Sequence, residues 1–449
     1  MQLDMTKGKP LPVILQFTIP LVIGNIFQQL YNMADTIIVG RYVGAGALAA
    51  VGSTGTIMFL ATGFAQGITA GFSILTAQRY GAGDKKGVKR SVANGIILAM
   101  IAAAILTLVC VSIMNPLLHL MNTPSDIFQD AYTYIMGISV GLTANIFYNL
   151  FSAYLRAVGN SQVPLFFLIF SACLNVGLDL LFIIRGGMGV AGAAWATNLS
   201  QAISAVLCAG YIWVKVPSLK PERAHWKIHG RDTRNQLAAG IPMGFQVAMT
   251  ASGTMIMQSA INRFGSVAVA AYTAAAKLQR LVIQGMIAMG QTMATYGGQN
   301  YGAGKPERVW QGVKASPLMV TIYWVFTFCV LMTGAQPLAR RFVDGSETEI
   351  LEDTALFLHV SVSFFPVLGL LCILRYTIQG VGFTNLAMLS GVSEMIARIL
   401  VSLCAVPAFG YIAVCFGDST AWVFADLFLI PAFAFVYRRL LRMKRQPLG

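Results

Sequence analysis

The residues with the clearest chemical potential are two aspartates that interrupt long apolar segments, Asp35 and Asp179. Each shares a helical face with an amide, because Asn32 precedes the first by three residues and Asn175 precedes the second by four. Two carboxylates close together in a low dielectric cannot both ionise cheaply, so such a pair can take up a proton. Carboxylate and amide oxygens, with the Thr197 hydroxyl, could equally bind a hard cation such as sodium.

Arginines near the helix ends place the two aspartates at the same depth. Asp35 precedes Arg41 by six residues, and Asp179 precedes Arg185 by six. At 1.5 Å per residue, each carboxylate lies about 9 Å from its arginine along the helix. A carboxylate at the centre of a membrane helix costs about 2.5–3.5 kcal/mol on insertion scales, so an unexplained one is a functional hypothesis. The alternative is a buried hydrogen-bonded pair that only fixes two helices together.

A second set of charges lies in the later apolar segments. Glu394 and Arg398 are four residues apart, which is the spacing of an ion pair on one helix. We interpret them as a structural pair, with substrate contact or a proton relay as the alternative. Asp426 has no partner that the sequence reveals, and it stays unassigned.

Three amides and one proline complete the candidates. Gln28, Asn145 and Asn149 either contact a substrate or satisfy polar groups on neighbouring helices. Pro20 interrupts its segment, frees a backbone carbonyl and permits a bend, which is either structural or part of a moving element.

The elements that position these residues follow from composition. Of the 449 residues, 56% are apolar and only 11% are charged, whereas a soluble protein carries about a quarter charged residues. Apolar segments near the ~20 residues that span a bilayer recur along the whole chain. The expected helices are 12–39, 48–77, 88–114, 128–151, 163–184, 189–214, 234–260, 267–297, 312–334, 354–379, 385–406 and 412–437. The sequence therefore predicts an all-α membrane protein with twelve transmembrane helices.

The net charge of +14 is distributed unevenly between the connections. Basic residues gather at 7–9, 79–90, 215–234, 305–314 and 438–445, whereas the alternate connections hold few and include the acidic run 344–353. Lys and Arg mark cytoplasmic loops, so both termini are expected inside. The basic charge then orients the chain and meets anionic lipid headgroups, and we expect no nucleic-acid partner.

An internal repeat organises the chain into halves. The run QRYGAG at 78–83 matches QNYGAG at 299–304, and Ile-Pro at 19–20 matches 241–242, at offsets of 221 and 222. Duplication explains a nearly constant offset. Six helices per half give two lobes of equal orientation, with a substrate site expected between them near the midplane. The predicted division is an amino-terminal lobe 1–214, a cytoplasmic linker 215–233 and a carboxy-terminal lobe 234–449.

Several segments together resemble the MATE (multidrug and toxic compound extrusion) family. They are YNMADTIIVG at 31–40, LRAVGN at 155–160, NVGLD at 175–179 and QNYGAGKPER at 299–308, and the likeness is to the bacterial DinF-like and MepA-like branch. The resemblance implies two six-helix lobes forming a V, with alternating access. It implies that Asp35, Asn175, Asp179 and Thr197 form an amino-lobe cation site, where protonation or sodium binding is linked to bending of the first helix near Pro20.

The expected function is secondary active multidrug efflux, in which cationic or amphipathic small molecules leave in exchange for a proton or sodium ion. The alternative is a flippase for a lipid or lipid-linked saccharide. An enzyme is disfavoured because no HExxH, GxSxG or paired catalytic motif occurs. We expect a monomer in the bacterial inner membrane, with small-molecule substrates and membrane lipid as partners and no cofactor beyond the coupling ion.

Overall fold

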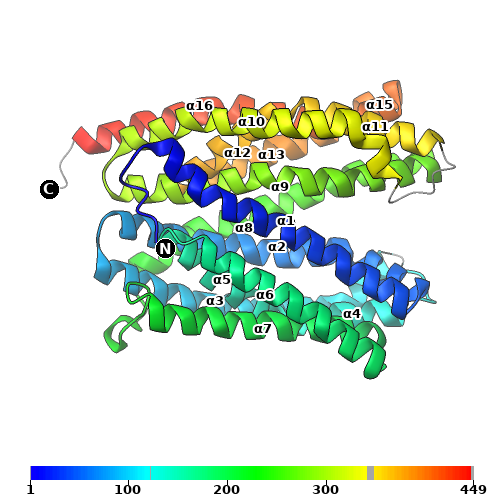
Figure 1. Cartoon of the computed structure of the whole chain (residues 1–449), viewed down its shortest axis with the longest axis horizontal. Coiled ribbons are helices and arrows are strands. Elements are labelled where there is room, and N and C mark those ends of the chain that lie inside the picture. The colour runs from blue at the N-terminus through cyan, green and yellow to red at the C-terminus, as the bar shows by residue number, and fades with distance from the viewer. Residues whose placement is uncertain (1, 122, 341–347, 446–449) are drawn as a thin grey trace. The chain divides into compact units, whose positions relative to one another are not determined.

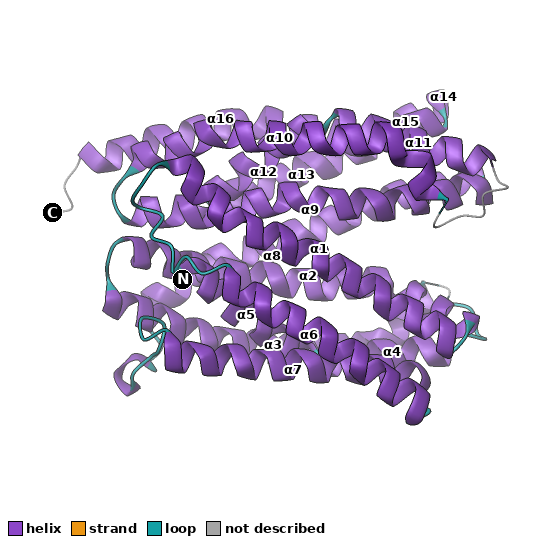
Figure 2. Cartoon of the chain, viewed as in Figure 1, coloured by secondary structure: helices purple, strands orange, loops and turns teal. Residues whose placement is uncertain are grey.

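The computed structural model describes residues 2–121, 123–340 and 348–445, and this part of the chain consists of helices and their connections, with no strand (Figures 1 and 2). The first half contains α1 (Pro10–Tyr42), α2 (Ala45–Gly81), α3 (Lys85–Leu120), α4 (Phe128–Val140), α5 (Leu142–Ala157), α6 (Gln162–Asp179), η1 (Leu180–Arg185), α7 (Gly189–Lys215) and η2 (Arg223–His225). The second half contains α8 (Gly230–Ile261), η3 (Asn262–Phe264), α9 (Ser266–Gly302), α10 (Pro306–Ala339), α11 (Thr348–Ser363), α12 (Phe365–Gly380), α13 (Thr384–Leu400), η4 (Val401–Ala405), α14 (Val406–Phe409), α15 (Tyr411–Cys415) and α16 (Gly417–Arg445). Residues 344–347 of the predicted acidic run lie outside the described residues.

Each of the twelve predicted segments corresponds to one helix or to a broken helix. The predicted fourth segment is the pair α4 and α5, bent by 45°, and the tenth is the pair α11 and α12, bent by 50°. Gly141 separates the first pair, and Pro366 lies in the first turn after the second break, where a ring without an N–H is tolerated. By length and apolar composition, seven described helices can cross a membrane, or nine if each bent pair counts as one span.

Two π-helical turns occupy matching positions in the two halves. The turn η1 follows α6 directly after Asp179, and η4 follows α13 after Leu400, about 221 residues later. Such turns are rare and are frequent at functional sites. The repeat thus extends from the sequence to local backbone geometry, although only the first copy carries a carboxylate at its start.

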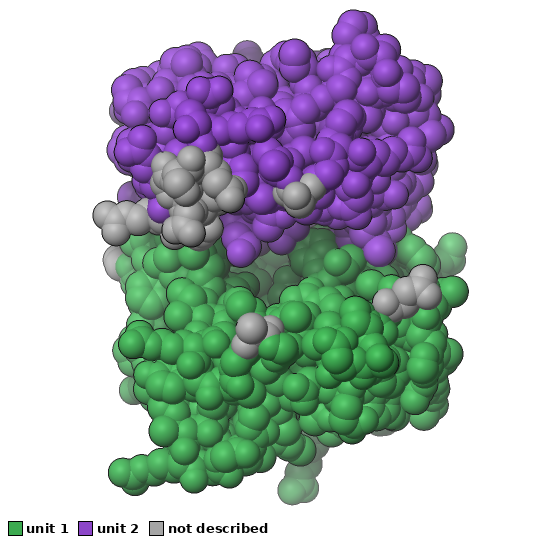
Figure 3. Space-filling model, turned by 90° about the vertical axis from the view of Figure 1, so that its right-hand side faces the viewer, with its two compact units in different colours: residues 1–4, 23–245 green, residues 5–22, 246–449 purple. Residues whose placement is uncertain are grey.

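The chain divides into two compact units (Figure 3), and two of the three boundaries between them fall inside α1 and α8. Unit 1 comprises residues 1–4 and 23–245, and unit 2 comprises residues 5–22 and 246–449. Both α1 and α8 therefore contribute their first part to one unit and the remainder to the other. The division predicted from the sequence, at 214 and 234, places the boundaries in loops. A pattern of apolar segments does not reveal that one long helix contributes to both units.

Unit 1 has a large apolar core from α2, α3, α5 and α7, with fully buried Tyr154, Leu118 and Leu142 among its side chains. A smaller apolar cluster is formed by residues of α1, α2, α4, η1 and α7, and it includes Tyr134. Close contact between α2 and the first part of α8 depends on glycine: a Cβ at Gly67 would lie 2.6 Å from the Met243 carbonyl oxygen. Apolar side chains also cover the outer surface, as expected where lipid is the solvent.

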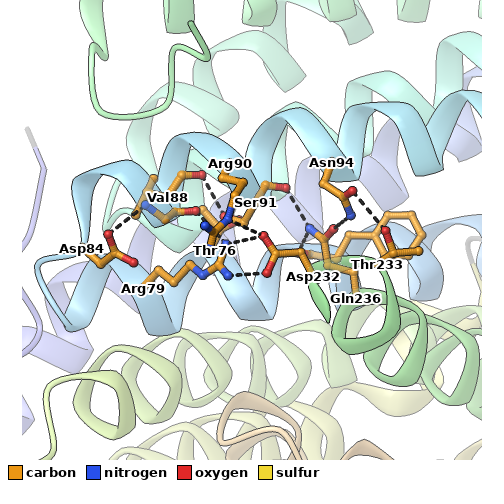
Figure 4. A network of polar contacts seen from close by, with 12 residues as sticks. Thr76, Arg79, Asp84, Val88, Arg90, Ser91, Asn94, Asp232, Thr233 and Gln236 are labelled. Atoms are coloured by element: carbon orange, nitrogen blue, oxygen red, sulfur yellow. Dashed lines mark hydrogen bonds and ion pairs between the residues drawn. The ribbon is translucent and has the colours of Figure 1, made fainter. Parts of the chain in front are cut away.

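A polar network within unit 1 joins the first turns of α8 to α2 and α3 (Figure 4). The Asp232 carboxylate accepts hydrogen bonds from Arg79 at 2.5 and 3.0 Å and from Arg90 Nε at 2.8 Å. Gln236, one turn later, accepts from Asn94 at 2.7 Å and donates to two backbone carbonyls of α2 and α3. Burial alone would raise the pKa of Asp232, but the hydrogen bonds and charges of the two arginines outweigh it and hold the pKa below the usual 3.8.

Candidate functional site

The structure brings together the four residues predicted as a cation site. Asp35 comes from α1, Asn175 and Asp179 from the last turn of α6, and Thr197 from α7, which packs against α6. The two carboxyl groups are near neighbours, close enough to interact with each other directly. Asn175 Nδ2 donates to Thr197 Oγ1 at 3.2 Å, so the amide is held by the neighbouring helix.

Several oxygen atoms of this group are buried and lack hydrogen-bond partners among the described residues. Asn175 and Asp179 are fully buried, and Asp35 is half-buried. Asp35 Oδ1, both Asp179 oxygens and Asn175 Oδ1 are buried, yet none has an aligned hydrogen-bond partner among the described residues. Buried polar atoms are normally paired, so a group of unpaired acceptors needs an explanation. Acceptor oxygens of this kind can take up a proton or ligate a small cation.

Two tyrosines that the sequence analysis missed complete this group. The Tyr31 hydroxyl lies within hydrogen-bonding reach of Thr197 and in electrostatic range of both aspartates. Tyr134 of α4 is buried and lies near the same two carboxylates. The signal for Tyr31 was present, since it precedes Asp35 by four residues, on the same face of the helix. Nothing in the sequence linked Tyr134 to the site, because α4 reaches it only through tertiary packing.

The three candidate amides share a small pocket next to this group. Gln28, Asn145 and Asn149 line it together with Tyr31, and its volume of about 10 Å³ is about the least that can admit one water molecule. Asn149 Nδ2 donates to Asn145 Oδ1 at 3.2 Å and to the Asn145 backbone carbonyl at 2.8 Å. Tyr31 borders both the pocket and the carboxylates, so it joins the two sets. Their role in binding substrate stays a prediction.

The remaining candidates lie apart from this group. The Asn32 side chain is exposed, and Tyr31 is the residue of that turn that lies beside the carboxylates. Pro20 is buried in unit 2, and α1 continues through it without a break. Among the described residues, no set of three or more His, Cys, Asp or Glu side chains is placed to hold a metal ion.

Glu394 and Arg398 form the predicted ion pair, with Arg398 Nη1 at 3.4 Å from Glu394 Oε2. The structure adds two partners that the sequence did not reveal. Arg375 of α12 pairs with Glu394, and Asp418 of α16 lies 3.1 Å from Arg398 Nη2. All three helices pack against one another in unit 2, so the charges bind the helices together. This network agrees with a structural role.

The comparison with known families gives the decisive observation. A family model described as MatE matches the chain twice, at residues 20–181 and 242–404. The chain belongs to the MatE family. The two matches lie 222 to 223 residues apart, so they also confirm the internal duplication. MatE proteins are membrane transporters, and the chain is a multi-pass member of that transporter family.

Curated relatives and solved structures agree with this assignment. The "Probable multidrug resistance protein YpnP" of Bacillus subtilis is 28% identical over 383 residues, 84% of each chain. The "FAD transporter" of Shewanella oneidensis is 24% identical over 80% of each chain. A crystal structure of a MATE protein in the bent conformation has a TM-score of 0.90 and covers 99% of each chain at 22% identity. The predicted twelve-helix, two-lobe fold is confirmed.

Proposed function

We propose that this protein exports amphipathic, predominantly cationic small molecules, in exchange for protons that bind at the Asp35–Asp179 pair. The observation that carries the proposal is the set of buried acceptor oxygens without hydrogen bonds at this pair. The names of the Bacillus relatives, which are called probable multidrug resistance proteins, support export of drugs. The same names leave the coupling ion open.

Exchange requires that proton and cargo bind the two lobe arrangements unequally, since a ligand shifts an equilibrium only through its differential affinity. In one arrangement Asp179 and Asp35 share a proton, which removes the repulsion between two buried carboxylates. In the other arrangement the pair ionises and releases the proton to water. Tyr31 lies between the pair and the pocket of amides, so its position suits it to transmit a change at the carboxylates. One charge moving down 100 mV supplies about 2.3 kcal/mol.

The setting of this exchange is the bacterial plasma membrane, with both termini in the cytoplasm. The support for this orientation is the concentration of Lys and Arg in alternate connections. The internal duplication supplies two lobes from one chain, so a monomer is sufficient for the pathway. Sodium is the competing ion, because carboxylate, amide and hydroxyl oxygens also suit a hard cation.

The test uses inside-out vesicles with ethidium as the cationic probe or FAD as the anionic one added to the medium, so that export appears as uptake into the lumen, with proton and sodium gradients imposed separately. We expect ethidium transport that follows the proton gradient and is lost in Asp35→Asn and Asp179→Asn. Glu222→Gln, which changes an exposed carboxylate of the linker, is the matched control and should transport like the wild type. Transport that follows only sodium would contradict the ion assignment. No ethidium transport by folded protein would refute drug export and favour the lipid flippase.

A further inference from the structure

Unit 2 contains a chain of four charged side chains, three of them buried and one half-buried, in which the positive and negative charges are equal in number. Glu394 of α13 contacts Arg375 of α12 and Arg398 of its own helix. Arg398 also contacts Asp418 in the first turn of α16, at 3.1 Å. Two arginines thus match two carboxylates. The Arg375 guanidinium is further occupied by a hydrogen bond from its Nε to Ser390 Oγ, at 2.9 Å.

Asp426 lies outside this chain of contacts, two turns after Asp418 on α16. Its neighbours Trp422, Ala425 and Leu429 are all buried, whereas Leu427 is exposed, so Asp426 lies on the inward face of the helix. Asp426 itself is only 6% exposed. Both of its carboxyl oxygens are buried, and in the part of the chain that the structure describes neither has a hydrogen-bond partner or an ion pair.

The groups that act on Asp426 come from the two helices packed most extensively against α16. Arg375 and Cys372 of α12 and Glu394 of α13 lie within electrostatic range. Helices α10, α11 and α15 and the turn η4 also contact α16, but none of their described titratable groups is among those that act on Asp426. The arginine near Asp426 is Arg375, and it is already paired with Glu394. An ionised Asp426 would therefore be an unmatched negative charge.

An unpaired ionised carboxylate is among the most costly groups to bury, and such a group takes up a proton instead. A bound hard cation is the other way to neutralise it. Hard cations take a shell of several oxygen ligands. The carboxylate near Asp426, that of Glu394, is already engaged by Arg375 and Arg398. A proton needs a single oxygen, which the site provides.

We propose that Asp426 is a second proton-binding residue of this protein, in unit 2 and separate from the Asp35–Asp179 pair. The carboxyl group is neutral when α16 is packed as in this structure. When the packing around it opens to water, its O–H bond breaks, the proton passes to water and the carboxylate remains. Unit 2, which lacks acids at the positions equivalent to Asp35 and Asp179, thereby has a titratable group of its own.

The test measures protonation directly, in the full-length protein reconstituted in lipid and without substrate or gradient, so it does not depend on whether the protein exports drugs. Infrared difference spectra between neutral and alkaline pH report the C=O stretch of each neutral carboxyl group. We expect Asp426→Asn to lose one such band, and to release one proton fewer per chain on alkalinisation. Asp418→Asn, the same substitution two turns away on α16, should keep the band because Asp418 is paired with Arg398.

Three outcomes would overturn the proposal. The first is an unchanged set of neutral carboxyl bands in Asp426→Asn, which would show that this residue does not release a proton between the two pH values. The second is a band that depends on sodium at constant pH, which would indicate a cation site instead. The third is failure of Asp426→Asn to fold while Asp426→Glu folds, because asparagine resembles the neutral acid and should be tolerated.

Discussion

Replacing Asp232 by asparagine should destabilise unit 1 strongly, because it removes the one carboxylate that two arginines share. The Arg79 side chain is 14% exposed and that of Arg90 is 38% exposed. Breaking a fully buried pair from one side costs about 3–5 kcal/mol. Water reaches Arg90 and screens part of the remaining repulsion, so we expect about 2–3 kcal/mol.

The assay is thermal unfolding of the purified protein in detergent, with Glu222→Gln as the matched control. At 2–4 °C per kcal/mol, the value for domains of 150–250 residues, the midpoint should fall by roughly 4–12 °C in Asp232→Asn. Glu222 also pairs with a basic residue of α3, Lys89, but it is exposed, so its loss should leave the midpoint unchanged. Equal midpoints for the two variants would refute this account of the network.

The same network has a defined pH dependence. The pKa of Asp232 in the folded protein lies below 3.8, so its contribution to stability is complete above pH 3.8 and is lost as the pH falls through the folded pKa. Wild type and Asp232→Asn should therefore differ most near neutral pH and converge in acid. Removing Arg90 from Asp232→Asn should restore part of the lost stability, because one unmatched charge is then absent.

Two further predictions concern close packing and the amino-terminal segment. Gly67→Ala should lower the free energy of unfolding by about 1–3 kcal/mol, because its Cβ would meet the Met243 backbone. Gly210→Ala, with open space around an exposed helical position, should raise it by up to about 1 kcal/mol in the same unfolding assay. Arg308 donates to three backbone carbonyls of the segment 5–8, at 2.9 to 3.2 Å, so Arg308→Lys should make trypsin cleavage after Lys7 about tenfold faster, as expected for the loss of one or two hydrogen bonds. An unchanged cleavage rate would show that the segment is held by other contacts.

The sequence predicted the elements well and the contacts between them only in part. Apolar length located all twelve segments, and the distances to Arg41 and Arg185 placed Asp35 and Asp179 at one depth, which is why their meeting was predictable. The ion pair between Glu394 and Arg398 was also predictable, because the two residues are four apart on one helix. These features are local or periodic, so one sequence is enough to reveal them.

What the sequence did not reveal depends on packing between distant segments. Tyr134 reaches the two carboxylates from α4, and Arg375 reaches Glu394 from α12. Asp232 looked like part of a solvated linker, although two arginines more than 140 residues earlier bind it. No periodicity encodes such contacts, because they depend on how helices turn their faces towards each other.

The central claim is that proton and cargo compete through the Asp35–Asp179 pair, and coupling between two ligands is reciprocal. The most direct measurement is therefore proton flux driven by cargo alone, in proteoliposomes without an imposed pH gradient. An outward ethidium gradient should drive protons in the opposite direction in the wild type and produce no proton flux in Asp35→Asn. Ethidium movement without any proton flux in the wild type, or undiminished proton flux in Asp35→Asn, would contradict the account.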